Sequence, residues 1–417
     1  MSGSSSRIHA FDSLRGLAAC SVIIGHLFMV MRGQQDAIYD RFFQWTRVVK
    51  QTPADVLFQG HAAVVLFFVL SGFVLYLLLA RAKLSMPAYV AKRVVRLYVP
   101  YLAAIVLGII GAHAVAGDTL DGFNSWINKF WSWPVTWSSI GEHLLFIGQF
   151  NSDRYDFTIW TLVHEMRISL VFPLIFLMVR RMRWWAALMP FVVASATMIV
   201  LRQPAVRESM NIVGFAAHGG LTAYVLTVHY MLAFAIGASL AHHRERLFAA
   251  YARLPVRTRI LLGVLTFMLY VYGGKALHIT GLATMMPYDW PMMAAAALLL
   301  VTAAAEPGFR RVLETSPCQY LGRISYSLYL FHPIVLLAML HGFAGRMPLG
   351  WLLIATFGLC FVVSDLAYRT IEQPAVELSR AAADRVGRVY DRLRARGRGV
   401  DGDRAGTRRY GAAGRMR

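Results

Sequence analysis

An arginine and a histidine stand inside the first apolar stretch of the chain, which runs from Ser13 to Met31. Arg15 and His26 are eleven residues apart, so on an α-helix they share a face within about 20° and lie roughly 16 Å apart along the axis. Polar groups inside a membrane span are costly and mark functional sites by default. This face would offer a cation at the membrane edge and an imidazole deep inside. A snorkelling arginine with a structural histidine would give the same pattern, and that alternative stays open.

A carboxylate of matching depth lies in another apolar stretch. Trp160 begins that stretch at the outer face, and Glu165 follows five residues inward, as far from the outer end as His26 is in its own stretch. We therefore expect Glu165 beside His26, where a carboxylate would orient a general base. A helix–helix hydrogen bond without chemistry is the structural alternative, and Arg167 is a competing partner for Glu165.

Two further arginines suit a phosphorylated ligand. Arg93 and Arg96 are three residues apart, so they are neighbours on one helical face, and paired guanidinium groups bind phosphate well. Arginines that only anchor a helix at the membrane boundary would look similar. Weaker candidates for lining a substrate site are Ser71, Trp160, Tyr329 and His332. The sequence predicts no metal site and no permanently bound cofactor.

The composition is that of a membrane protein that crosses the bilayer several times. Of the 417 residues, 57% are hydrophobic and only 15% are charged, and the mean hydropathy is +0.51. A soluble domain is more polar than this. The net charge of +20 would suggest nucleic acid in a soluble protein, but here it reflects membrane topology, and we expect no nucleic-acid partner. The three cysteines have no paired spacing, so we expect no disulfide.

The fold class predicted is an all-α bundle of about ten transmembrane helices. The seventh and eighth stretches are short and must borrow flanking residues, and 211–221 is apolar enough for an eleventh, re-entrant piece. The ten stretches are Ser13–Met31, Ala62–Ala80, Leu97–Val115, Trp160–Val179, Trp184–Leu201, Ala223–Ala241, Ile260–Tyr272, Trp290–Ala304, Ile324–Leu340 and Leu349–Tyr368.

Basic residues predict that both termini are cytoplasmic. That orientation places 31 of the Lys and Arg residues on the inner side and 10 on the outer side. A short lead over residues 1–12 precedes the membrane domain, residues 13–375. Residues 376–417 form a basic cytoplasmic tail, which we expect to be disordered or partly helical and attracted to anionic lipid.

Taken together, five segments closely resemble the acyltransferase-3 family of bacterial membrane O-acyltransferases. They occur in the family's order over roughly residues 7–378, and the ordered set is specific although each segment is weak alone. The segments are Phe11–Ala19 with Arg15 followed by His26, Phe67–Phe73, Arg93–Tyr101, Trp160–Glu165 and Gly322–His332.

The resemblance implies a multi-pass protein of the bacterial cytoplasmic membrane that moves an acyl group, usually acetyl from acetyl-CoA, to a hydroxyl of a glycan-like acceptor. It also implies that Arg15 and His26 are essential and that Arg93 and Arg96 face the donor. The segment from His164 to Arg167 departs from the family pattern, which leaves the partner of the histidine open. Some relatives carry a fused extracytoplasmic domain, for which this chain has no room, so an extracytoplasmic partner transferase is a possible addition.

Residues and resemblance together predict a mechanism. The nucleotide end of acyl-CoA would bind Arg93, Arg96 and Arg15 at the inner face, and its pantetheine arm would carry the thioester to His26. His26 would then deprotonate a hydroxyl of a surface glycan, a lipid-linked sugar or a secreted metabolite. A covalent acyl-histidine is a variant of this mechanism. The alternative function is a proton-coupled transporter or flippase of a glycan-like or anionic solute.

Overall fold

A computed structural model describes residues 8–31, 48–81, 85–115, 117–148, 150–201, 222–278 and 286–411. Within these ranges it contains ten helices that are long and apolar enough to cross a membrane, which confirms the predicted all-α class. They are α1 (His9–Met31), α3 (Gly60–Arg81), α4 (Met86–Val115), α7 (Ile159–Arg181), α8 (Trp184–Leu201), α10 (Thr222–Ala252), α11 (Val256–His278), α12 (Asp289–Ala305), α14 (Ser316–Phe343) and α15 (Leu349–Ala367).

All ten predicted stretches coincide with these helices. The two short stretches do borrow flanking residues, since α11 begins at Val256 and α12 at Asp289. A helix satisfies every backbone hydrogen bond within itself, which is why apolar stretches become helices in lipid. The predicted eleventh piece, 211–221, lies outside the described residues.

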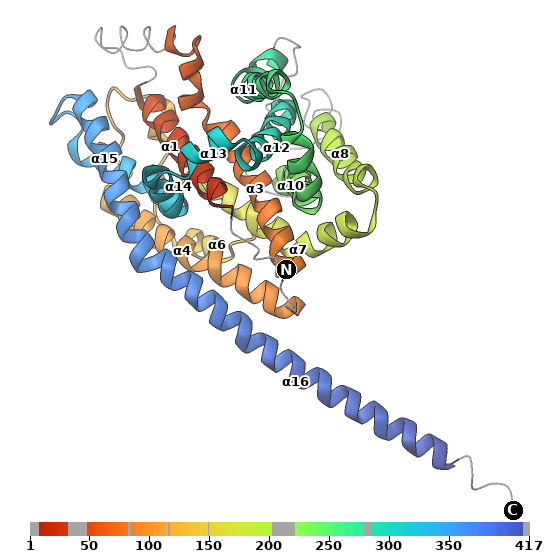
Figure 1. The fold of residues 1–417 in the computed structure, drawn as a ribbon. Helices are drawn as coiled ribbons and strands as arrows, with labels where there is room; N and C mark the ends of the chain where they lie inside the picture. Colours follow the sequence, from red (N-terminus) through yellow and green to blue (C-terminus); the bar gives the residue numbers. More distant parts are fainter. Residues whose placement is uncertain are drawn as a thin grey trace, which may run out of the picture.

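Short helices occupy the connections. They are η1 (Pro53–Phe58), α5 (Ser125–Asn128), α6 (Trp137–Leu144), η2 (Met286–Tyr288), α13 (Pro307–Leu313) and a π-helical turn, η3 (Tyr368–Glu372). After η3 the chain continues as α16 (Gln373–Gly411), which packs against α4 and then extends beyond the other helices (Figure 1). The start of the predicted tail is therefore helical, one of the two states expected for it, because small buried residues such as Ala375, Ser379 and Ala383 give α16 a face to pack.

The first and ninth spans form the most extensive helix pair of the bundle. In α1 and α14 the chain runs in the same direction, since Gln319 Nε2 donates to the carbonyl of His9 at one end while His26 contacts His332 at the other. Gly16 and Gly322 lie backbone to backbone with the opposite helix, where a Cβ atom would collide with Leu321 or with Asp12. These glycines bring the two helices together directly beside Arg15.

Candidate functional site

Two histidines meet between α1 and α14. Nδ1 of His26 lies 2.9 Å from Nε2 of His332, and the two rings are stacked with centroids 5.2 Å apart. Nδ1 of His332 lies 3.1 Å from the carbonyl oxygen of Leu328, so this nitrogen must carry the hydrogen it donates. In a neutral ring Nε2 of His332 is then an acceptor, and Nδ1 of His26 is the donor to it. The lone pair of a neutral His26 is therefore on Nε2, the nitrogen that a general base would use.

Aromatic side chains pack around this pair of histidines. The ring of Phe157 meets His26 edge-on at 5.0 Å between centroids, and Trp126 lies at 5.8 Å. Phe130 stacks on Phe157 at 4.4 Å. These residues come from the segment between α4 and α7, so that segment provides a wall beside His26.

The start of α7 is fixed by a buried carboxyl group. Oδ1 of Asp156 accepts hydrogen bonds from the backbone N–H of Thr158 at 2.8 Å and from its hydroxyl at 2.7 Å. Burial raises the pKa of Asp156 to about 7. Because Phe157 lies between these residues, the same turn holds the ring that contacts His26.

Glu165 does not contact His26, so the predicted pairing is wrong. Its Oε1 atom lies 2.9 Å from a guanidinium nitrogen of Arg93 and accepts a hydrogen bond from Ser71 at 3.2 Å. Equal depth in the membrane does not fix the direction in which a side chain points. Helix α7 packs against α3, α4 and α10, whereas α1 packs against α14 and α3, so the carboxylate meets the arginine of α4.

Arg93 is correspondingly buried inside the helix bundle. Only 7% of the residue is exposed, and the nitrogen that binds Glu165 also lies 2.9 Å from the hydroxyl of Ser169. Arg96, three residues on, points into a cavity of about 920 Å³ that Arg93 does not line. The two arginines that the sequence placed on one face thus have different surroundings.

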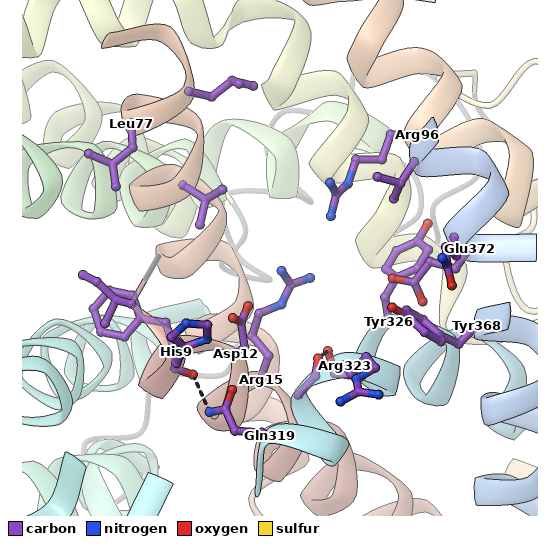
Figure 2. Close-up of a pocket in the computed structure, with 18 of the residues that line it drawn as sticks. His9, Asp12, Arg15, Leu77, Arg96, Gln319, Arg323, Tyr326, Tyr368 and Glu372 are labelled. Atoms are coloured by element: carbon purple, nitrogen blue, oxygen red, sulfur yellow. Dashed lines mark hydrogen bonds between the residues drawn. The ribbon is translucent and has the colours of Figure 1, made fainter. Parts of the chain in front are cut away.

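The cavity collects basic side chains at the end of α1 opposite to His26. Arg15 of α1 and Arg96 of α4 point into the same space (Figure 2), and two more arginines, Arg323 and Arg380, line it. We call this space the arginine cavity. Its acidic lining residues are Asp12, Glu372 and Glu377. A cavity with several guanidinium groups and a minority of carboxylates can bind a phosphorylated ligand.

One face of α14 joins the arginine cavity to the histidine pair. Gly322 and Tyr326 line the cavity, Tyr329 lies one turn further, and His332 follows at helical spacing. The hydroxyl of Tyr329 is 3.0 Å from that of Thr161, and its ring lies 6.1 Å from that of His332. The structure therefore places Arg15 and His26 on α1, with Tyr329 and His332 on the adjacent α14, while Arg96 reaches the arginine cavity from α4.

The remaining predicted site residues face elsewhere. Trp160 packs against His164 of its own helix and against Tyr230 of the neighbouring α10. Nδ1 of His164 forms a 2.8 Å hydrogen bond with the hydroxyl of Thr227, also in α10. Arg167 donates to the backbone carbonyls of residues 147 and 148 rather than to Glu165. These groups connect α7 to its neighbours and do not contact the histidine pair.

Sequence reasoning missed a second buried polar cluster. The carboxylate of Asp289 lies 2.5 Å from Nε2 of His61 and 3.0 Å from Nε2 of His229. Nδ1 of His229 in turn meets the hydroxyl of Ser195 at 2.8 Å, and Trp290 donates to the same hydroxyl. This cluster joins four helices. The available signal was Asp289 itself, an acid at the start of an otherwise apolar stretch.

Sequence reasoning also missed Glu372. It stands in the π-helical turn, lines the arginine cavity and accepts a 2.7 Å hydrogen bond from Ser327. In the sequence this residue stands between the last predicted span and the basic tail, which gave no signal of a site.

Comparisons with known proteins identify the family of the chain. The chain is 25% identical to "Acyltransferase MdmB" of Streptomyces mycarofaciens over 389 residues, covering 89% of this chain and 92% of the relative. It is 23% identical to "Putative peptidoglycan O-acetyltransferase YrhL" of Bacillus subtilis (strain 168) over 391 residues, 88% of this chain but only 54% of that relative. No solved structure matches the chain. A family model described as "Acyltransferase domain" matches residues 8–369, so the chain belongs to the acyltransferase-3 family of membrane O-acyltransferases.

Proposed function

We propose that this protein transfers an acyl group, normally acetyl, from acyl-CoA to a hydroxyl of a glycan-like acceptor at the bacterial cytoplasmic membrane. The observation that carries the proposal is the joint placement of the arginine cavity and the histidine pair on α1 and α14. Acyl-CoA has a phosphorylated nucleotide at one end and the reacting thioester at the other. The two ends of this helix pair offer the matching chemistry.

The nucleotide phosphates bind Arg15 and Arg96 in the arginine cavity. From there the pantetheine arm runs along the face of α14 that carries Tyr326 and Tyr329 toward His26. Eleven residues of helix separate Arg15 from His26, a rise of roughly 16 Å that suits the arm. Arg93 and Glu165 hold α4 and α7 together and so position Arg96 without touching the donor.

His26 acts as the general base. Its Nε2 atom removes the proton of the acceptor hydroxyl, whose oxygen attacks the thioester carbonyl, and the CoA thiolate leaves and takes up a proton. The hydrogen bond from Nδ1 to His332 keeps the lone pair on Nε2 before the reaction and supports the imidazolium that forms during it.

The acceptor reaches His26 from the side opposite to the arginine cavity. The name of the Bacillus subtilis relative suggests a cell-wall glycan, and a lipid-linked sugar or a secreted metabolite has the same hydroxyl chemistry. A separate extracytoplasmic transferase could complete the transfer as a partner.

The test is single-turnover transfer from acetyl-CoA in nanodiscs, with release of the CoA thiol as the readout and peptidoglycan fragments as acceptor. We expect His26→Ala to lose about 10²- to 10⁴-fold in rate, the usual contribution of general-base catalysis, while CoA still binds. Wild-type rates in His26→Ala would refute the mechanism. A wild-type protein that consumes no thioester with any hydroxyl acceptor would instead favour a transporter.

A further inference from the structure

The long helix α16 has an apolar face that extends beyond the end of α4, the helix against which it packs. Ala375, Ser379 and Ala383 are buried where α16 packs on α4, and a Cβ atom added at Gly387 would still lie 3.7 Å from the Cβ atom of Ala88. Ala88 belongs to the first turn of α4, so α16 has no further residues of α4 to contact beyond this point. Helix α16 nevertheless continues away from the bundle (Figure 1).

The packing face continues into this free part of the helix. At 100° per residue, Val386, Val389, Tyr390 and Leu393 fall in a sector about 100° wide that overlaps the face of Ala375 and Ser379. Val389 is 50% exposed and Leu393 is 62% exposed. Beyond the end of α4, the face that binds the bundle is thus apolar and uncovered among the described residues.

Basic residues border the apolar sector of this stretch on both edges. Arg385 and Arg392 border the apolar sector on one edge and Arg394 borders it on the other, each about 90 to 110° from its centre. Asp384, Arg388 and Asp391 lie on the far face, about 150 to 170° away. All six side chains are exposed. An apolar sector with basic residues on both edges is typical of a helix that lies in the headgroup region of a membrane.

We propose that residues 385–395 of α16 bind anionic lipid headgroups in the leaflet at the Arg15 end of the bundle. The apolar sector enters the boundary of the acyl chains, and the arginines on its edges bind lipid phosphates. A second copy of this helix is the poorer partner. Its arginine-lined edges would lie against the arginine-lined edges of the first copy and would repel them. Lipid is already present beside a chain that spans the membrane. Each arginine near an anionic surface strengthens binding by about fivefold.

The test uses the full chain without its three cysteines, carrying a nitroxide on Leu393→Cys or, as matched control, on Asp391→Cys. The protein is placed in nanodiscs of phosphatidylcholine alone or of equal parts phosphatidylcholine and phosphatidylglycerol. Collision with oxygen and with a water-soluble nickel chelate reports the depth of the label. We expect the label at 393 to enter the apolar region in the anionic discs, while the label at 391 stays in water in both.

The triple variant Arg385→Gln, Arg392→Gln and Arg394→Gln should weaken this binding by about a hundredfold, the product of three fivefold terms. Hydrogen exchange of residues 385–395 in the unmodified chain provides a second readout, with stronger protection expected in anionic discs. A label at 393 that stays in water, or that reaches equal depth in both compositions, overturns the proposal. Spin–spin broadening between two copies without a change in depth also overturns it, in favour of a dimer.

Discussion

When both rings are neutral, the hydrogen bond between His26 and His332 has a single permitted direction. The 2.9 Å contact joins Nδ1 of His26 to Nε2 of His332, and the carbonyl of Leu328 fixes the tautomer of His332. A neutral partner orients a general base and supports its protonated form, but it attracts the new charge less strongly than a carboxylate does. His332 should therefore matter less than His26.

His332→Ala should lower the single-turnover rate of transfer from acetyl-CoA by about ten- to a hundredfold, below the full contribution of a general base. His332→Gln should recover part of this loss, because its amide oxygen can accept the Nδ1 hydrogen of His26. Affinity for CoA should be unchanged in both variants. Wild-type transfer by His332→Ala would show that the pair is structural.

Arg96 and Arg93 should differ in what they affect. Arg96→Ala removes a guanidinium from the arginine cavity and should raise the Kd for CoA about ten- to a hundredfold, since a charge-assisted hydrogen bond contributes about 1.5–3 kcal/mol. Arg93→Ala leaves Glu165 unpaired inside the bundle, so it should mainly lower the temperature of unfolding. Titration calorimetry and thermal unfolding separate the two effects. Equal loss of CoA affinity in both variants would show that Arg93 also binds the donor, as the sequence predicted.

Asp156 should make the protein less stable as the pH rises. Burial raises the pKa of this carboxyl to about 7, above its ordinary value of 3.8, so the folded state holds the proton more tightly than the unfolded state does. The stabilisation is complete at low pH and is lost as the pH rises through about 7, by up to about 4 kcal/mol. Asp156→Asn keeps an oxygen for Thr158 and should remove this trend. Unfolding temperatures from pH 5 to 8 that decline equally in both proteins would contradict this assignment.

Asp289→Asn should strongly destabilise the bundle. The carboxylate is 1% exposed and accepts hydrogen bonds from two histidines, and removing one partner of a buried ionic cluster costs about 3–5 kcal/mol. Asp153→Asn is the matched control, because its pair with Lys129 is partly exposed and should contribute under about 1 kcal/mol. Thermal unfolding in one detergent measures both. Equal shifts would mean that the buried cluster carries no net stability.

The orientation predicted from the basic residues places Arg181 and Arg310 in the cytoplasm with Arg15. Trp133 and Gly342 should lie on the outer side. Reporter fusions at these four positions measure the orientation directly. Inverted labelling would put the arginine cavity outside, where acyl-CoA is absent, and would remove the proposed donor.

The spans of this chain could be predicted from hydropathy. Hydropathy suffices for this, because lipid offers no hydrogen-bond partner and an apolar stretch of about 20 residues must become a helix. Helical periodicity likewise placed Arg15 and His26 on one face of α1. The same periodicity placed Tyr329 and His332, three residues apart, on one face of a later span.

Which polar groups meet depends instead on how the helices pack. Depth and periodicity leave the rotation and neighbours of each helix open, so the sequence paired His26 with Glu165, whereas packing pairs His26 with His332. Backbone contact at Gly16 and Gly322 brings α1 onto α14, while Arg93 neutralises Glu165 in a place where an unpaired carboxylate would be costly. Close packing between helices, which hydropathy does not encode, therefore set the composition of the site.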